Sequence, residues 1–239
     1  MDGRVQKKPG CYNLSLSEQS HIEDGALPVK ALLENLDHLV YATPDLDQTC
    51  CQLGESLGVA PMPAGHHPGW GTRNALLGLG AHMYLEVIGP DPGSPGPQAA
   101  PPFNIDRLEG PQLVTWACRG TRLETILQRA YRLGLDLGCV LSGSRNQSDG
   151  STLTWTLTDP HMPRAAGILP FFIDWGDSVH PASSAPTGCT LLSLQAEHPD
   201  PDLLTPILEG LGLSLPIIRG DRPKLLARLA CPRGQVVLT

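Results

Sequence analysis

Two short apolar runs constrain this chain most, because each contains one ionisable residue that a buried strand would not ordinarily contain. Residues 36–40 include His38, and residues 83–89 include Glu86. Side chains alternate between the two faces of a strand, so each of these residues shares a face with apolar neighbours two positions away. An ionisable group on a buried face needs a partner, a metal ion or water. We therefore expect His38 and Glu86 to face a cavity.

The sequence between the two runs predicts a helix, a loop and a further strand. Thr43 is expected to cap a helix that begins at Pro44, and Gly58 is expected to end it. Residues 63–74 are rich in Gly, Pro and His and predict a loop, and residues 75–79 predict a strand. The order of elements is thus strand, helix, loop, strand, strand.

The segments DHLVYAT, HPGWGTRNALLGLG and YLEVIGP resemble the glyoxalase-like members of the vicinal oxygen chelate superfamily. The resemblance covers roughly residues 35–239. It implies an α+β fold, in which paired βαβββ modules form a half-open barrel. It also implies one divalent metal ion, of unknown identity, bound by His38 on the first strand and Glu86 on the last. Enzymes of the superfamily usually draw three or four ligands from both modules.

The same order of elements recurs further along the chain, which indicates a second module. It comprises a strand at 112–117, a helix at 123–133, a segment at 142–150 in the place of 64–72, and strands at 152–157 and 168–176. This module lacks the expected ligands. Thr115 or Trp116 stands opposite His38, and Ile173 stands opposite Glu86. Asp174 is one residue off and belongs on the other face unless a bulge shifts the register.

A third, partial βαβββ-like module is expected at the C-terminus. The predicted organisation is a flexible tail at 1–33, the first module at 34–90, a Pro/Gly-rich linker at 91–110, the second module at 111–176, a linker at 177–188, and the third module at 189–239. Both linkers are expected to be exposed. The third module has no mate in the chain, so it packs on the other two or on another subunit, and a homodimer is one expectation.

The proposed ligand-binding residues lie around the mouth and walls of the half-barrel. They are His67, Trp70, Arg73, Asn74, Trp116 and Phe171. Arg73 suits the carboxylate or phosphate of a small substrate, although Arg73 and Asn74 are equally consistent with closing a turn. The aromatic residues suit an apolar cavity wall, although aromatic strand residues more often belong to the core.

Two functions remain open from the sequence. One is an enzyme for a small oxygen-rich metabolite, either a metal-dependent lyase or isomerase or a dioxygenase-like protein, with Glu86 as the catalytic proton carrier. The other is a metal-free module that binds or sequesters a small molecule. No G-x-S-x-G elbow, P-loop or dinucleotide motif is present.

Charge and cysteine usage narrow the partners and the compartment. The net charge is −7 and the 17 basic residues do not cluster, so neither nucleic acid nor a membrane is an expected partner. No apolar run has the length of a membrane span. The seven cysteines include no C-x-x-C pair, which favours reduced thiols and a cytoplasmic location.

Overall fold

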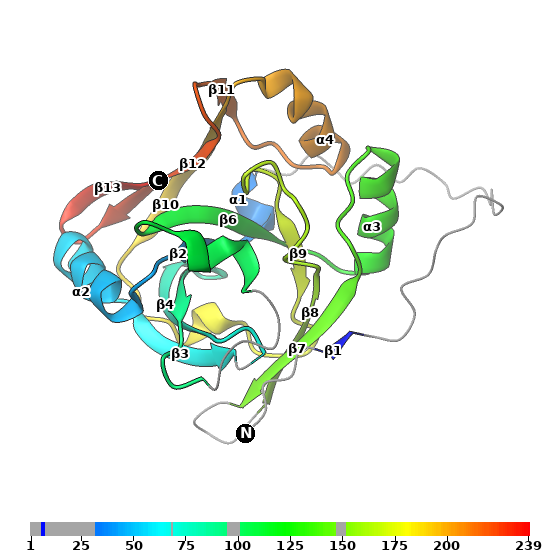
Figure 1. Ribbon diagram of the computed structural model, residues 1–239. Coiled ribbons are helices and arrows are strands. Elements are labelled where there is room, and N and C mark those ends of the chain that lie inside the picture. The colour runs from blue at the N-terminus through cyan, green and yellow to red at the C-terminus, as the bar shows by residue number, and fades with distance from the viewer. Residues whose placement is uncertain (1–5, 8–31, 68, 95–100, 147–151) are drawn as a thin grey trace.

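The fold is one curled nine-stranded sheet with a separate four-stranded sheet packed beside it (Figure 1). The computed structural model describes residues 6–7, 32–67, 69–94, 101–146 and 152–239. The strands of the large sheet lie in the order β1-β7-β8-β9-β6-β2-β5-β4-β3. Those of the small sheet lie in the order β11-β10-β12-β13.

The elements of the first module are α1 (Leu32–Asn35), β2 (Leu36–Ala42), α2 (Leu46–Leu57), β3 (Met62–His67), β4 (Thr72–Gly80) and β5 (Met83–Pro90). Those of the second are η1 (Pro102–Arg107), β6 (Gln112–Arg119), α3 (Leu123–Arg132), β7 (Val140–Asn146), β8 (Thr152–Thr158), β9 (Phe171–Asp174) and η2 (Pro181–Ser183), and β1 (Gln6–Lys7) pairs with β7. Those of the third are β10 (Thr190–His198), η3 (Pro201–Leu203), α4 (Thr205–Gly210), β11 (Ile217–Arg219), β12 (Lys224–Cys231) and β13 (Gly234–Leu238).

The duplication predicted from the sequence is visible in the strand pairing. In each module the first strand pairs in parallel with the last, β2 with β5 and β6 with β9. The two modules join where β2 and β6 pair antiparallel. The α+β fold of paired βαβββ modules is therefore confirmed.

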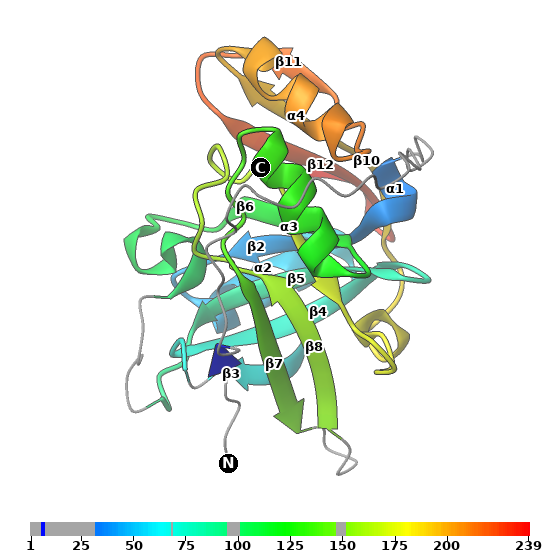
Figure 2. The same ribbon diagram turned by 90° about the vertical axis from the view of Figure 1, so that its right-hand side faces the viewer.

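The curled sheet has two faces with different environments. Its convex face packs against α2, α3 and the small sheet through a core that includes Leu39, Leu85 and Trp116 (Figures 1 and 2). Its concave face carries a second apolar cluster, which includes Ile88 and Phe171. Since side chains alternate along each strand, every strand contributes to both faces.

Two local predictions were wrong in detail. Helix α2 begins at Leu46, and its N-cap is Asp45, whose side chain accepts a hydrogen bond from the Gln48 N–H. Thr43 instead bonds Thr49, hydroxyl to hydroxyl, at 2.7 Å. The predicted loop at 63–74 contains most of the edge strand β3, which pairs with β4 despite its Gly and Pro content, and the first residues of β4.

The linkers are more closely packed than the sequence indicated. Pro102 and Ile105 of the first linker are buried. In the second linker Ala182 and Ala185 are buried, and the Gly78 N–H donates to the Pro186 carbonyl at 2.8 Å. The linker at 177–188 thus covers one end of β4. Most of the predicted tail lies outside the described residues.

The third module has the expected sequence of elements but a different strand order. Its first strand, β10, pairs in parallel with β11 and not with the last strand. The module packs on its own chain, where the Leu113 N–H donates to the carbonyl of Thr239. The homodimer stays a prediction. Among the described residues, no helix has the length and apolar character needed to cross a membrane.

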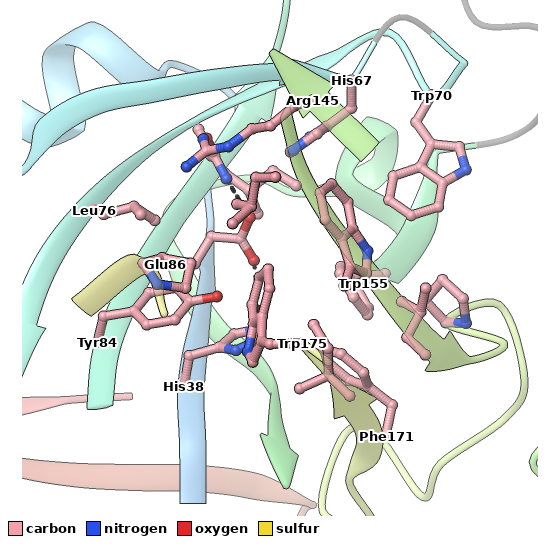
Figure 3. A pocket seen from close by; sticks show the side chains of 18 residues that line it. His38, His67, Trp70, Leu76, Tyr84, Glu86, Arg145, Trp155, Phe171 and Trp175 are labelled. Carbon is pink, nitrogen blue, oxygen red and sulfur yellow. Dashed lines mark hydrogen bonds and ion pairs between the residues drawn. The ribbon is translucent and has the colours of Figure 1, made fainter. Parts of the chain in front are cut away.

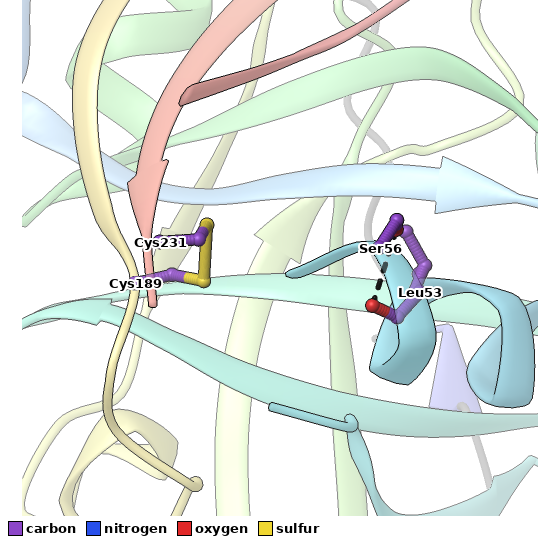
Figure 4. Close-up of a disulfide and its surroundings, with 4 residues drawn as sticks. All are labelled: Leu53, Ser56, Cys189 and Cys231. Atoms are coloured by element: carbon purple, nitrogen blue, oxygen red, sulfur yellow. Dashed lines mark hydrogen bonds between the residues drawn. A yellow bond between two sulfur atoms is a disulfide. The ribbon is translucent and has the colours of Figure 1, made fainter. Parts of the chain in front are cut away.

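One expectation about the cysteines is wrong, because Cys189 and Cys231 form a disulfide (Figure 4). The two Cα atoms are 4.3 Å apart, at the facing ends of β10 and β12. These residues are separated by 42 positions in the sequence, so their proximity depends on the pairing of β10 with β12.

We expect reduction of this disulfide to lower the free energy of unfolding by about 2–4 kcal/mol, because the bond restricts the unfolded chain. Urea denaturation with and without dithiothreitol measures the change. The Cys189→Ala/Cys231→Ala variant should no longer respond to the reductant, whereas Cys51→Ser, which removes an exposed thiol, should respond as the wild type does. Equal stability of oxidised and reduced wild type contradicts the prediction.

Candidate functional site

A cavity of about 70 Å³ opens on the concave face between the two modules (Figure 3). Its lining comprises His38, His67, Trp70, Asn74, Leu76, Tyr84, Glu86, Ile88, Phe103, Arg145, Leu153, Trp155, Leu157, Pro160, Phe171, Ile173, Trp175 and Pro181. The residues expected to face a cavity, His38 and Glu86, therefore do so together.

His38 is held between aromatic rings at the base of the cavity. It pairs across β2 and β5 with Tyr84, and the two rings stack with centroids 4.6 Å apart. Phe171 of β9 meets the imidazole edge-on at 5.5 Å. The imidazole is 3% exposed, so its orientation is set by packing and by its hydrogen bonds.

Asp37, next to His38, forms a buried hydrogen-bond network behind the imidazole. Neighbouring strand residues normally point to opposite faces, but the pairing of β2 with β6 shifts register at this position. Asp37 Oδ1 consequently lies 2.7 Å from His38 Nδ1. The carboxylate also accepts a hydrogen bond from Trp175 Nε1 at 3.1 Å, and lies 3.1 Å from His180 Nε2.

The partners of these histidines define their tautomers. His180 Nδ1 accepts from the Ala182 N–H, so its Nε2 carries the proton that bonds Asp37. His38 Nδ1 likewise donates to Asp37, which leaves His38 Nε2 directed into the cavity. Burial by itself would raise the pKa of Asp37, but the hydrogen bonds and charges of His180 and His38 outweigh it and hold the pKa well below its usual range.

Glu86 lies beside His38 and is fixed by Asn74. Glu86 Oε2 is 3.8 Å from His38 Nε2, and Glu86 Oε1 accepts a hydrogen bond of 2.6 Å from Asn74 Nδ2. The Asn74 Oδ1 atom is buried with no hydrogen-bond partner. Figure 3 shows the Glu86 side chain between His38 and the upper part of the cavity.

The donor atoms fit an open metal site and not a closed one. His38 Nε2 and the Glu86 carboxylate are suitable ligands, and the bond from His38 to Asp37 is typical of a metal-binding imidazole. The opposite wall is apolar where Phe171 and Ile173 face the cavity. No group of three or more His, Cys, Asp or Glu side chains suited to a metal was found within the described residues. An ion here would take its other ligands from water or substrate.

The upper part of the cavity contains His67, Trp70 and Arg145 (Figure 3). The rings of His67 and Trp70 meet edge-on at 5.9 Å. Burial lowers the pKa of His67 from its usual value. Arg145 comes from β7 in the second module, and the Nη1 atom of its guanidinium is buried with no hydrogen-bond partner.

Two residues predicted for ligand binding lie outside the cavity. On β4, Asn74 and Leu76 point into the cavity, so Arg73, which directly precedes Asn74, points away and its Nη2 donates to Asp47 of α2 at 2.7 Å. Trp116 is fully buried on the convex side, where its Nε1 donates to the Ile168 carbonyl. The other predicted residues, His67, Trp70, Asn74 and Phe171, line the cavity.

Sequence reasoning missed Asp37, Arg145, Trp155 and His180 as parts of the site. A signal existed for Arg145, because the repeat places segment 142–150 opposite 64–72 and thereby sets Arg145 opposite His67. Asp37 was missed because regular alternation places it on the other face from His38. The structure departs from that alternation at the register shift.

These features define a class of protein: paired βαβββ modules in a half-barrel, with a His and a Glu from the first module facing the cavity. The family model described as "Glyoxalase-like domain" matches residues 36–212. The chain belongs to this glyoxalase-like family.

A solved structure with a TM-score above 0.5 supports the fold. A hypothetical protein from Staphylococcus aureus has a TM-score of 0.59 at 13% identity, covering 79% of this chain and 87% of that one. Methylmalonyl-CoA epimerase from Mycobacterium tuberculosis has a TM-score of 0.39 at 22% identity, covering 63% of this chain and 94% of that one. No curated protein sequence matches the chain significantly.

We expect Asp37→Asn to lower the free energy of unfolding at pH 7 by about 1–3 kcal/mol, because it disturbs a buried, charge-assisted network. The folded-state pKa of Asp37 is below its unfolded value, so this stabilisation is present above about pH 4 and is lost as the pH falls further. Denaturant unfolding of both proteins from pH 7 to pH 3 measures this difference.

The stability difference between wild type and Asp37→Asn should therefore narrow towards pH 3. Asp47→Asn is the matched control, because that carboxylate is 76% exposed and should contribute little. A difference that is constant over this pH range would contradict the assignment of an ionised, hydrogen-bonded Asp37.

Proposed function

We propose that this protein is a glyoxalase-like enzyme whose reacting centre is His38 with Glu86. The observation that supports the proposal is the approach of His38 Nε2 to Glu86 Oε2, at 3.8 Å, with both atoms on the cavity. A hydrogen bond orients each of the two side chains, from His38 to Asp37 and from Asn74 to Glu86. Hydrogen bonds of this kind hold reacting groups in position.

Glu86 is the proposed proton carrier. Its carboxylate accepts a proton from a carbon next to an oxygen-bearing carbon of the substrate and returns the proton to a neighbouring atom, which isomerises the substrate. Asn74 Nδ2 donates to the other carboxylate oxygen and so leaves Oε2 directed at the reacting atoms. The buried side chains around His38 limit the access of water to this step.

His38 and Glu86 are also the residues that would hold a divalent ion. The chemistry of such an ion is to polarise the oxygens of the substrate and so make the neighbouring carbon more acidic. Asp37 orients His38 for this role by fixing the imidazole tautomer.

The second candidate function is a metal-free module that binds a small molecule. The apolar wall of Trp155, Phe171 and Trp175 favours it, because that wall offers a contact surface without reacting groups.

The cytoplasmic location stays a prediction, and the disulfide between Cys189 and Cys231 weakens it because stable disulfides are rare in the cytosol.

Divalent ions should distinguish the two functions. We expect Mn²⁺, Zn²⁺ or Ni²⁺ to raise the Tm of the wild type, because a ligand of the native state adds about 2.7 kcal/mol at 100 times its Kd. His38→Ala should abolish the increase, as should Glu86→Gln in large part. Differential scanning fluorimetry measures it.

His66→Ala is the matched control for this experiment. His66 is 68% exposed, bonds Asp91 at 2.7 Å and does not line the cavity, so its loss should leave the ion response intact. If no ion changes the Tm of the wild type, the metal-free binding module becomes the better description. If His66→Ala also abolishes the response, the ion binds elsewhere.

A further inference from the structure

Arg145 is a cationic side chain in the cavity that the reacting centre does not use. It extends from β7 of the second module towards β3 of the first, and its approach depends on Gly65. A Cβ at position 65 would lie 2.5 Å from Arg145 Nη1 and 2.9 Å from its Cδ. The absence of a side chain at Gly65 therefore makes the space that the guanidinium occupies.

The guanidinium has unused hydrogen-bonding capacity in this position. Its Nη1 is buried and has no hydrogen-bond partner. A buried donor without a partner is costly, and arginine stays charged in proteins, so this group favours an incoming acceptor. Burial lowers the pKa of Arg145 from its usual value, while the charge of Glu86 acts in the opposite direction.

The other charged groups near the cavity do not neutralise this site. Asp37 is fully buried behind His38 and bonds His38, Trp175 and His180. Glu86 has one oxygen bonded to Asn74 and the other facing His38. An anion beside Arg145 would thus meet one cation with a free donor, and Glu86 further along.

The size and walls of the cavity restrict the anion. About 70 Å³ accommodates a compact group of a few heavy atoms, and Trp155 and Phe171 contribute apolar surface to the wall of the same cavity. Trp155 packs over Gly143, where a Cβ would collide with the indole ring. A planar carboxylate matches the fork of a guanidinium, with which it forms two parallel hydrogen bonds.

We propose that Arg145 binds the carboxylate of a compact, short-chain carboxylic acid, whose apolar part lies against Trp155 and Phe171. This proposal names a substrate class for the proposed function. It rests on the proposed function only for the reaction of the acid after binding. The binding itself needs neither a metal ion nor proton transfer, so it is tested separately.

The test is a titration of the whole protein with 2-oxobutanoate, followed by tryptophan fluorescence and isothermal titration calorimetry. Wild type should bind the acid, and Arg145→Gln should bind it about 10- to 100-fold more weakly, the range for loss of a charge-assisted hydrogen bond. The uncharged methyl ester should bind both proteins equally. Glu86→Gln should bind the acid more tightly than wild type, because it removes a like charge.

Two variants control for folding and for charge. Gly65→Ala retains Arg145 but displaces its guanidinium, so it should also weaken binding of the acid. Arg73→Gln removes an arginine of the neighbouring strand that bonds exposed Asp47 and lies outside the cavity, so its affinity should equal that of the wild type. Melting curves of each variant establish that it is folded.

The proposal is overturned if wild type binds no 2-oxobutanoate, or if Arg145→Gln and Gly65→Ala bind it as wild type does. It is also overturned if binding of methylphosphonate depends on Arg145 and binding of 2-oxobutanoate does not. That result would assign the site to phosphoryl groups. If no divalent ion raises the Tm but binding of the acid still depends on Arg145, only the proposed reacting centre is contradicted. If Arg145→Gln does not weaken binding of the acid but divalent ions still raise the Tm, only the carboxylate site at Arg145 is contradicted.

Discussion

The arrangement of the site depends on the burial of one carboxylate, that of Asp37. The side chain is fully buried, so its charge must be compensated by hydrogen bonds. One donor is the adjacent residue His38, and the other two, Trp175 after β9 and His180 before η2, come from a distant part of the chain. The network therefore links the first module to the end of the second and orients the imidazole as well.

The register shift on β2 makes this network possible. In a regular strand Asp37 would point to the convex, apolar side, where no donor would compensate its charge. The shift against β6 brings Asp37 and His38 within 2.7 Å of each other. The linker at 177–188 packs here for the same reason, because the buried Asp37 carboxylate needs hydrogen-bond donors and this segment supplies one, His180.

The sequence predicted the architecture well because duplication and apolar alternation are properties of whole segments. Both modules and the facing pair His38 and Glu86 were predicted from position, pattern and family resemblance. The errors concern single residues for which tertiary pairing outweighs local preference. Residues of β3 are poor strand formers, yet pairing with β4 makes them an edge strand.

The errors within the site have the same origin. Arg73 was selected because it lies in a conspicuous Gly- and Pro-rich segment, but its neighbour on β4, Asn74, faces the cavity, so alternation turns Arg73 to α2. Arg145 lies in the equivalent segment of the second module, and its route across the cavity depends on Gly65 of the first. Such a contact between modules cannot be read from either segment alone.

The two modules contribute different chemistry to one cavity. The first supplies His38, Asn74 and Glu86, and the second supplies Arg145 with an aromatic wall that includes Trp155. A ligand that satisfies both halves must place its acidic end near Arg145, its apolar part on the wall and its remaining oxygen towards His38 and Glu86. In the second module, Phe171 and Ile173 line the cavity, and such apolar side chains can pack against a carbon chain but cannot bind a metal ion.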